Sequence, residues 1–165
     1  MYNIGMDKKE MLTRGLQEGF GGETTRKSVA RGGFTLESSH YETKDGNTYH
    51  DEWMADRVGG GQELVEVDGK RFTRVYAGGT ISEEALKDFG LTKKDVISFL
   101  KKNILENGDK IRLQGNFQPE AEGDWQYKYN VIDREESIPV TVGKEHIYYK
   151  GELVFVHNFI ISPIE

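Results

Sequence analysis

The chain has 165 residues, a net charge of -6 and a pI near 5.3, with 36% hydrophobic and 30% charged residues. This balance predicts one soluble globular domain, and the acidic charge disfavours nucleic acid and anionic membranes as partners. Cysteine is absent, which excludes disulfides and thiolate chemistry. The N-terminal residues lack the apolar run of a signal peptide, and no stretch approaches the roughly 18 apolar residues of a membrane span. We therefore expect a cytoplasmic protein.

The first half of the chain predicts a helix followed by four strands. Asp7 and Glu10 have the spacing of a capping box, and apolar residues at helical spacing then predict a helix over residues 7–19. The basic stretch 23–33 has no period and predicts a mobile loop, either an anion-binding lid or a solvated connection. Strands are expected at 34–43 and 48–54, around a turn at 44–47, and in a hairpin over 61–77.

The second half repeats this order, which indicates a tandem duplication. Residues 143–151, GKEHIYYKG, follow the pattern of residues 61–69, GQELVEVDG. A short helix is expected at 82–89, a longer one from Thr92, and strands at 110–117, 125–132 and in a hairpin over 143–161. The predicted fold is α+β, with residues 1–165 as a single domain of two repeats, about 7–79 and 92–161. Each repeat is a helix plus four-stranded antiparallel unit, with the helices on one side of the sheet.

The turn and strand motifs resemble those of a known family. They are Tyr49-x-Asp51, Gly59 to Gly61, Gly61-Gln62-Glu63, Asp68-Gly69-Lys70 and Tyr76-x-Gly78, answered by Gly143-x-Glu145-x-Ile147-x-Tyr149-x-Gly151. From about Phe20 to its end, the chain resembles the uncharacterised prokaryotic family catalogued as domain of unknown function 5680. Members of that family sometimes follow a helix-turn-helix domain, so the resemblance implies a sensing role.

Two equivalent glutamates are candidate site residues. A two-residue turn in the first hairpin places Glu63 opposite Arg74, so Glu63 is either a site carboxylate or half of a partly buried ion pair. The same reasoning places Glu145 opposite Val156, without a cross-strand cation. Glu145 then needs another partner, for which Arg112 is the nearest candidate, or it has a raised pKa that would mark a site.

Aromatic and acidic side chains share one strand face, at Tyr49, Asp51 and Trp53, with Tyr127 on the equivalent later strand. This pattern is either a ligand platform or the packed face of a sheet. His157, in an apolar strand, is either a hydrogen-bonded core histidine or a catalytic group. The four histidines lack metal-ligand spacing, so we expect neither a metal nor a cofactor.

No catalytic motif is present, so the first hypothesis is a non-enzymatic domain that binds a small molecule or a partner protein. The ligand is expected on the sheet face away from the helices, and a homodimer is one expected assembly. The alternative is a hydrolase or isomerase of small substrates with Glu145, His157 or Asp51 as acid and base; a deep pocket holding two of them would favour it. The candidate ligand-binding residues are Tyr49, Asp51, Trp53, Glu63, Arg74, Tyr127, Glu145 and His157.

Overall fold

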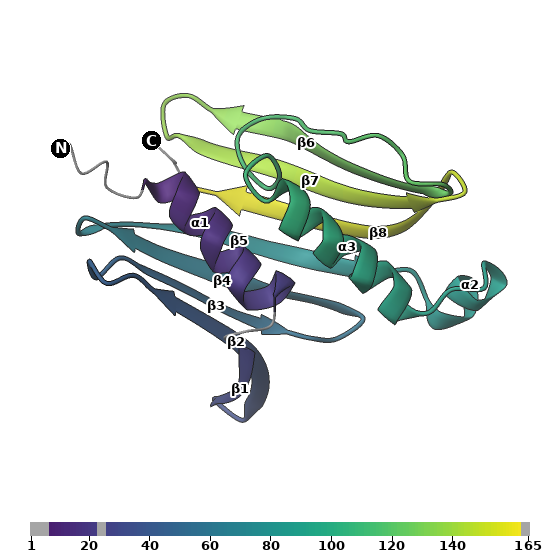
Figure 1. The fold of residues 1–165 in the computed structure, drawn as a ribbon, viewed down its shortest axis with the longest axis horizontal. Coiled ribbons are helices and arrows are strands. Elements are labelled where there is room, and N and C mark those ends of the chain that lie inside the picture. The colour runs from purple at the N-terminus through teal and green to yellow at the C-terminus, as the bar shows by residue number, and fades with distance from the viewer. Residues whose placement is uncertain (1–6, 23–25, 163–165) are drawn as a thin grey trace.

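One antiparallel sheet of eight strands forms the body of the protein (Figure 1). The computed structural model describes residues 7–22 and 26–162. Across the sheet the strands follow the order β1-β2-β3-β4-β5-β8-β7-β6. They are β1 (Arg26–Arg31), β2 (Phe34–Glu42), β3 (Thr48–Met54), β4 (Val58–Val67), β5 (Lys70–Thr80), β6 (Trp125–Glu135), β7 (Val140–Tyr149) and β8 (Glu152–Ile161).

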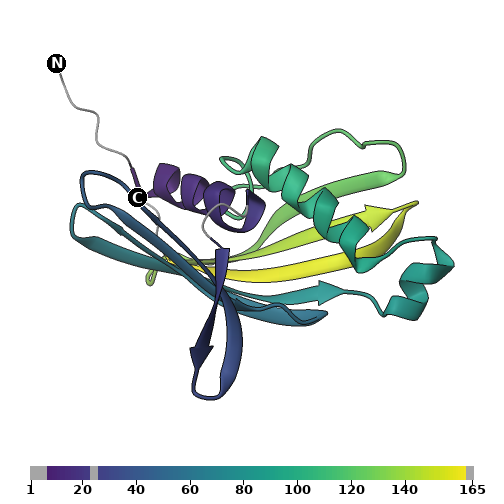
Figure 2. The same cartoon turned by 60° about the horizontal axis from the view of Figure 1, so that its bottom comes forward.

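The helices are α1 (Lys8–Leu16), which continues into a π-helical turn η1 (Gln17–Gly21), α2 (Glu83–Asp88) and α3 (Lys93–Asn107). The predicted starts are confirmed. The Asp7 side chain accepts a hydrogen bond from Glu10 N at 2.7 Å, and Thr92 forms a reciprocal capping box with Asp95. Helices α1 and α3 lie over the same face of the sheet, whereas α2 lies beyond its end (Figure 2).

The predicted fold class is wrong, because the chain does not form two units of one helix and four strands. The first half contributes five strands and the second half three, and all eight join in one sheet through the pairing of β5 with β8. Residues 26–31, predicted as a mobile loop, form edge strand β1, while residues 23–25 lie outside the described part. Residues 110–117, predicted as a strand, are irregular because Arg112 adopts a left-handed conformation with φ 57°.

A three-stranded pattern does recur on the two sides of the β5–β8 junction. The cross-strand row of Asp51, Glu63 and Arg74 on β3, β4 and β5 corresponds to a row on β6, β7 and β8. The members of the second row are Tyr129, Glu145 and His157. Between the two rows Tyr76 pairs with Phe159, so the halves meet around this pair in the middle of the sheet.

The face beneath α1 and α3 holds the core. From the helices, Met11, Leu16 and Ile104 are buried there, and the aromatic rings of the strands pack against them. Helix α1 approaches the sheet closely because Gly15 has no side chain; a Cβ there would lie 2.0 Å from the Tyr49 ring. This close approach fixes the position of η1, which continues from α1 toward the cavity described below.

Candidate functional site

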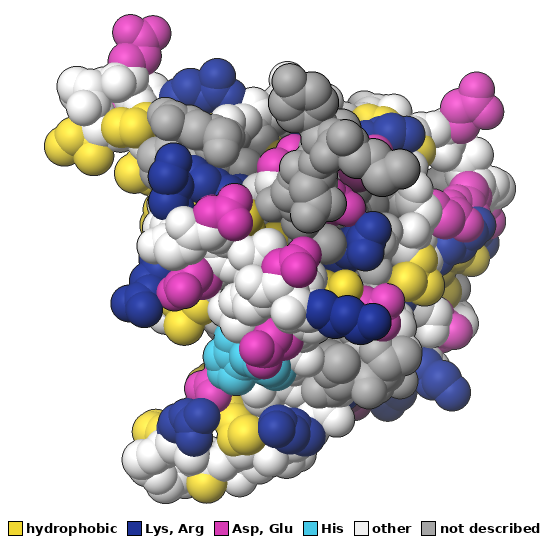
Figure 3. Space-filling model, turned by 60° about the vertical axis from the view of Figure 1, so that its left-hand side comes forward, with side chains coloured by type: hydrophobic (Ala, Val, Ile, Leu, Met, Phe, Trp, Pro, Cys, Tyr) yellow, Lys and Arg dark blue, Asp and Glu magenta, His cyan; other side chains and the backbone are white. Residues whose placement is uncertain are grey.

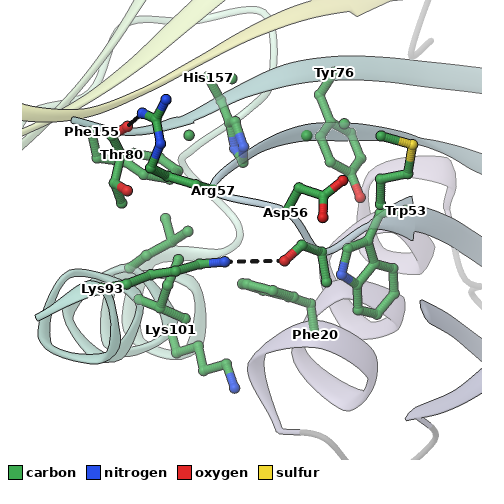
Figure 4. Close-up of a pocket in the computed structure, with 18 of the residues that line it drawn as sticks. Phe20, Trp53, Asp56, Arg57, Tyr76, Thr80, Lys93, Lys101, Phe155 and His157 are labelled. Atoms are coloured by element: carbon green, nitrogen blue, oxygen red, sulfur yellow. Dashed lines mark hydrogen bonds between the residues drawn. The ribbon is translucent and has the colours of Figure 1, made fainter. Parts of the chain in front are cut away.

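A cavity of about 170 Å³ lies between the sheet and helix α3 (Figure 4). The aromatic part of its wall consists of Phe20, Trp53, Tyr76 and Phe155. Its floor, defined by buried or nearly buried ionisable side chains, contains Asp51, Arg112 and His157. Its mouth, defined by more exposed charged side chains, contains Arg26, Asp56, Arg57, Lys93 and Lys101. The cavity thus combines an apolar wall with a polar floor and a charged mouth.

Tyr76 reaches the floor because Gly61 stands opposite it in the β4–β5 ladder. A Cβ on Gly61 would lie 2.6 Å from the Tyr76 hydroxyl oxygen, so only glycine lets this side chain cross β4 without a shift. The hydroxyl then donates to the Asp51 carboxylate, with its oxygen 3.0 and 3.1 Å from the two acceptor oxygens. Three strands therefore cooperate to place one carboxylate beside the cavity.

The turn between β3 and β4, residues 55–57, closes one side of the cavity and is held by two cations. Lys93 Nζ, at the start of α3, donates to the Ala55 carbonyl at 3.0 Å (Figure 4). Arg57 Nη1 donates to the Thr80 carbonyl at 2.7 Å, and Thr80 N donates back to the Arg57 carbonyl at 3.1 Å. Carbonyl oxygens are neutral acceptors, so both side chains keep their positive charge at the mouth.

The predicted ion pair between Glu63 and Arg74 is confirmed, and it is fully buried. The Arg74 guanidinium donates to both carboxylate oxygens of Glu63, and the Tyr49 hydroxyl donates to the same carboxylate at 2.6 Å. Burial opposes ionisation of Glu63, but the charge and hydrogen bonds of Arg74 outweigh it and lower the pKa of Glu63. Glu63 is therefore an ionised partner within the core.

Arg112 is the partner of Glu145, which confirms the first of the two alternatives for Glu145 and not the raised pKa. Its Nε and Nη2 each donate to a Glu145 oxygen at 2.9 Å, and the Tyr127 hydroxyl adds a bond of 2.6 Å. Despite burial, the Arg112 charge shifts the pKa of Glu145 well below its ordinary value. The Arg112 carbonyl also accepts from Arg74 Nη1 at 2.5 Å, which connects the two buried pairs.

The register predicted for the second hairpin is wrong by one residue. A β-bulge between Ile147 and Tyr148 shifts the β7–β8 ladder, so Glu145 faces His157 and not Val156. His157 Nδ1 lies 3.4 Å from the nearer Glu145 oxygen, without the alignment of a hydrogen bond. Burial lowers the pKa of His157 against the opposing effect of Glu145, so the neutral imidazole is favoured.

Asp51 differs from the other two buried acids. Within the described residues, its one hydrogen-bond donor is the Tyr76 hydroxyl, and no lysine or arginine bonds to it. It also stands directly across the ladder from Glu63, a second negative charge. Burial and then the Glu63 charge raise the pKa of Asp51 well above its ordinary value. The cavity floor therefore holds a carboxyl group to which no cation among the described residues is hydrogen-bonded.

The eight candidate residues divide into two groups. Asp51, Trp53 and His157 line the cavity. Tyr49, Glu63, Arg74, Tyr127 and Glu145 belong to the buried ion pairs and are not among the lining residues. Sequence reasoning missed Tyr76, although its register opposite Gly61 in the predicted hairpin was the available signal. The cavity also lies on the face covered by the helices, not on the open face where a ligand was expected.

The open face of the sheet carries a pair of histidines. His40 and His50 stand opposite each other on β2 and β3, with their Nδ1 atoms 3.4 Å apart, and His50 Nε2 lies 3.1 Å from Glu52. Figure 3, which brings the left-hand side of Figure 1 forward, shows histidine side chains beside acidic ones at the surface. Among the residues that the structure describes, no group of three or more His, Cys, Asp or Glu is arranged to hold a metal ion.

Comparison of the chain with models of known protein families, with curated proteins and with solved structures found no match. In residues 7–22 and 26–162, no helix is long and apolar enough to cross a membrane. The cavity and the side chains that line it are therefore the features of the molecule that bear on its function.

Proposed function

We propose that this protein is a small-molecule binding domain whose ligand occupies the cavity between the sheet and α3. The observation that carries the proposal is the preformed cavity of about 170 Å³, which joins aromatic walls to a buried carboxyl group at Asp51. Ligand sites are typically concave and mostly apolar, with a few placed polar groups. An apolar cavity of about 150 Å³ holds one benzene molecule, so the enclosed part of this cavity fits roughly seven non-hydrogen atoms of a ligand.

The chemistry of the floor also favours a binding role over a structural one. A buried carboxyl group without a cationic partner opposes folding, because its ionised form loses hydration without compensation. At the equivalent position of the second half stands Tyr129, a buried tyrosine whose hydroxyl donates to the Leu113 carbonyl at 2.6 Å. The fold therefore accepts an uncharged residue in this place, and the acid in the first half is a group kept at a cost in stability.

The two tryptophans allow a direct test by NMR with a library of small fragments. Trp53 lines the cavity, whereas Trp125 does not line it and stacks on Phe99 at a ring distance of 5.0 Å. Binding in the cavity should shift the indole N–H signal of Trp53 and leave that of Trp125 in place. Ile97→Phe, which extends a lining side chain into the cavity, should abolish the shift.

Leu105→Phe is the matched control, because Leu105 lies on the same helix with 48% of its surface exposed, and it should preserve binding. If no fragment moves the Trp53 signal, or if Ile97→Phe binds fragments as well as the wild type, the proposal fails.

A second candidate is an acid–base enzyme that acts on the same ligand, as a hydrolase or isomerase. It is favoured by one observation: Asp51 and His157 line the same cavity, and their pKa values are shifted in opposite directions, upward and downward. A protonated acid and a neutral base would then be available together. Conversion of a bound fragment into product, lost in His157→Gln while binding remains, would support this candidate; fragments that stay unchanged would count against it.

The wider biological setting is also a proposal. The resemblance to domain of unknown function 5680 supports a prokaryotic protein in which ligand binding serves sensing. The absence of cysteine supports a cytoplasmic location, and the charge of -6 supports a partner other than nucleic acid or an anionic membrane. A protein partner or a second copy of the chain would use the open face of the sheet.

A further inference from the structure

The buried charges of the protein do not cancel. Among the described residues the buried acids are Asp51, Glu63 and Glu145, and the buried bases are Arg74 and Arg112. The two arginines are each bound by a glutamate through paired hydrogen bonds, which uses both positive charges. If Asp51 is ionised, one buried negative charge has no buried positive charge to balance it among the described residues. This charge lies at the cavity floor.

The mouth of the cavity has the opposite sign. Arg26, Arg57, Lys93 and Lys101 line it, together with one acid, Asp56. Arg57 and Lys93 hold neutral backbone carbonyls, so neither charge is cancelled by that bond. Arg26 lies 5.7 Å from the centre of the Trp53 ring but is paired with Glu37 at 3.0 Å, and Lys101 lies 5.4 Å from the centre of the Phe20 ring. The positive charge at the mouth therefore depends mainly on Arg57 and Lys93. A ligand in the cavity thus meets an acid at one end and cations at the other.

We propose that the cavity binds a small zwitterion, with its ammonium group against the Asp51 carboxylate and its anionic group at the basic mouth. The inference rests on the proposed function and adds to it the chemical class of the ligand. The ammonium would supply the missing positive charge beside Asp51, and the Tyr76 ring would contact its carbon chain. The cavity volume of about 170 Å³ limits the length of the ligand. A cavity of this size suits a chain of roughly five or six carbons between the ammonium group and the anionic group.

Binding of such a ligand is linked to a proton. Burial and the Glu63 charge favour the protonated form of Asp51 in the free protein, whereas an ammonium ligand requires the carboxylate. The titratable groups around Asp51 are Tyr49, Glu63, Arg74, Tyr76, Arg112 and His157. Of these, the glutamate and the arginines stay charged and the tyrosines stay neutral near pH 7. Burial lowers the pKa of His157, so its imidazole is already neutral, and Asp51 is the group that exchanges the proton. Affinity should rise with pH, and binding should release a proton.

Three probes of matched size test the ligand class: 6-aminohexanoate, 6-hydroxyhexanoate, which lacks the cation, and 6-amino-1-hexanol, which lacks the anion. Titrations followed by the Trp53 indole signal and by calorimetry give their dissociation constants. We expect 6-aminohexanoate to bind at least tenfold more tightly than either analogue at pH 7. Calorimetry in two buffers with different ionisation enthalpies should show proton release for the two amines and none for 6-hydroxyhexanoate.

Three variants assign the two ends of the ligand. Asp51→Asn, which keeps the size of the side chain, should remove the preference for 6-aminohexanoate over 6-hydroxyhexanoate. Tyr76→Phe keeps the carboxylate and should retain that preference, which provides a second measurement if Asp51→Asn folds poorly. Lys93→Gln should reduce the preference for 6-aminohexanoate over 6-amino-1-hexanol and leave the cation preference unchanged. An unchanged Trp125 signal serves as the check on folding.

The inference is overturned if 6-hydroxyhexanoate binds as tightly as 6-aminohexanoate, or if Asp51→Asn binds 6-aminohexanoate like the wild type. It is also overturned if none of the three probes binds while other fragments shift the Trp53 signal. In each of these cases the cavity still binds small molecules, so the proposed function survives. Only the absence of any fragment binding removes both.

Discussion

Replacing each buried glutamate by glutamine tests whether the two ion pairs hold the fold together. In Glu63→Gln the Arg74 guanidinium loses both charge-assisted bonds in a site that water does not reach, and in Glu145→Gln the same happens to Arg112. Removing one partner of a buried pair typically costs about 3–5 kcal/mol, because it leaves the other charge uncompensated. Both variants should therefore unfold far more easily than the wild type.

The structure also predicts which variant suffers more. Without Glu63, Arg74 keeps one strong acceptor, the Arg112 carbonyl at 2.5 Å. Without Glu145, the Arg112 side chain has no hydrogen-bond acceptor left among the described residues; it keeps the more distant attraction of Glu63 and its contact with the Phe159 ring, whose centre lies 4.9 Å from the guanidinium carbon. Arg112 also belongs to the irregular segment after α3, which it fastens to the sheet, so Glu145→Gln should be the more destabilising change.

Urea and thermal unfolding at pH 7 measure these effects. At about 2–4 °C per kcal/mol for a domain of this size, the melting temperature should fall by roughly 6–20 °C. The control is Glu66→Gln, which breaks a cross-strand pair with Arg71 on the open face of the same β4–β5 ladder and should leave the melting temperature unchanged. A melting temperature of Glu145→Gln equal to or above that of the wild type would refute the structural role assigned to this pair.

Two further predictions concern the cavity floor. The raised pKa of Asp51 means that its contribution to folding is present below the unfolded pKa of about 3.9 and is lost as pH rises toward the folded pKa. Asp51→Asn should therefore increase the melting temperature more at pH 8 than at pH 4, and an equal increase at both values would contradict the burial argument. Gly61→Ala should lower stability and displace Tyr76, since the new Cβ would lie 2.6 Å from its hydroxyl. Gly115→Ala, with no atom within 4 Å of the new Cβ, is its control, and similar melting temperatures for the two variants would count against the close packing.

Local turn chemistry made the first hairpin predictable from sequence. The pair Asp68-Gly69 adopts positive φ values of 51° and 74°, the conformation required by a two-residue turn, and this turn fixes Glu63 opposite Arg74. The same reasoning failed in the second hairpin, where a bulge adds one residue, Val154, to β8 opposite the step from Ile147 to Tyr148. Sequence periodicity does not reveal such a bulge when the bulged residue and its neighbours are all apolar, as Leu153, Val154 and Phe155 are.

The number of strands was harder to predict, because it depends on tertiary contacts. Strand β1 lacks alternation: its residues are mostly exposed, and it exists because its backbone pairs with β2 at the edge of the sheet. The segment 110–117 shows the reverse, since Ile111 and Leu113 alternate as in a strand and are both buried. Arg112 between them also turns inward to bind Glu145, which a strand would not allow. A long-range ion pair thus overrides the local pattern.

The comparison of the two halves gives the strongest reason to regard the cavity as a site and not as a gap left by the fold. Both halves keep a glycine, Gly61 or Gly143, where a tyrosine hydroxyl comes close to the backbone. In the second half that hydroxyl belongs to Tyr129, whose ring is completely buried against Phe159 and fills the position equivalent to Asp51.

In the first half the tyrosine beside the glycine is Tyr76, which comes from β5. The position equivalent to Tyr129 holds a small acid, Asp51. A tyrosine hydroxyl therefore lies beside the strand glycine in both halves, but position 51 carries a small carboxylate where position 129 carries a buried ring. The fold accepts a large uncharged side chain at this place in the row, as the second half shows, so the small carboxylate at position 51 is the feature that a function must explain.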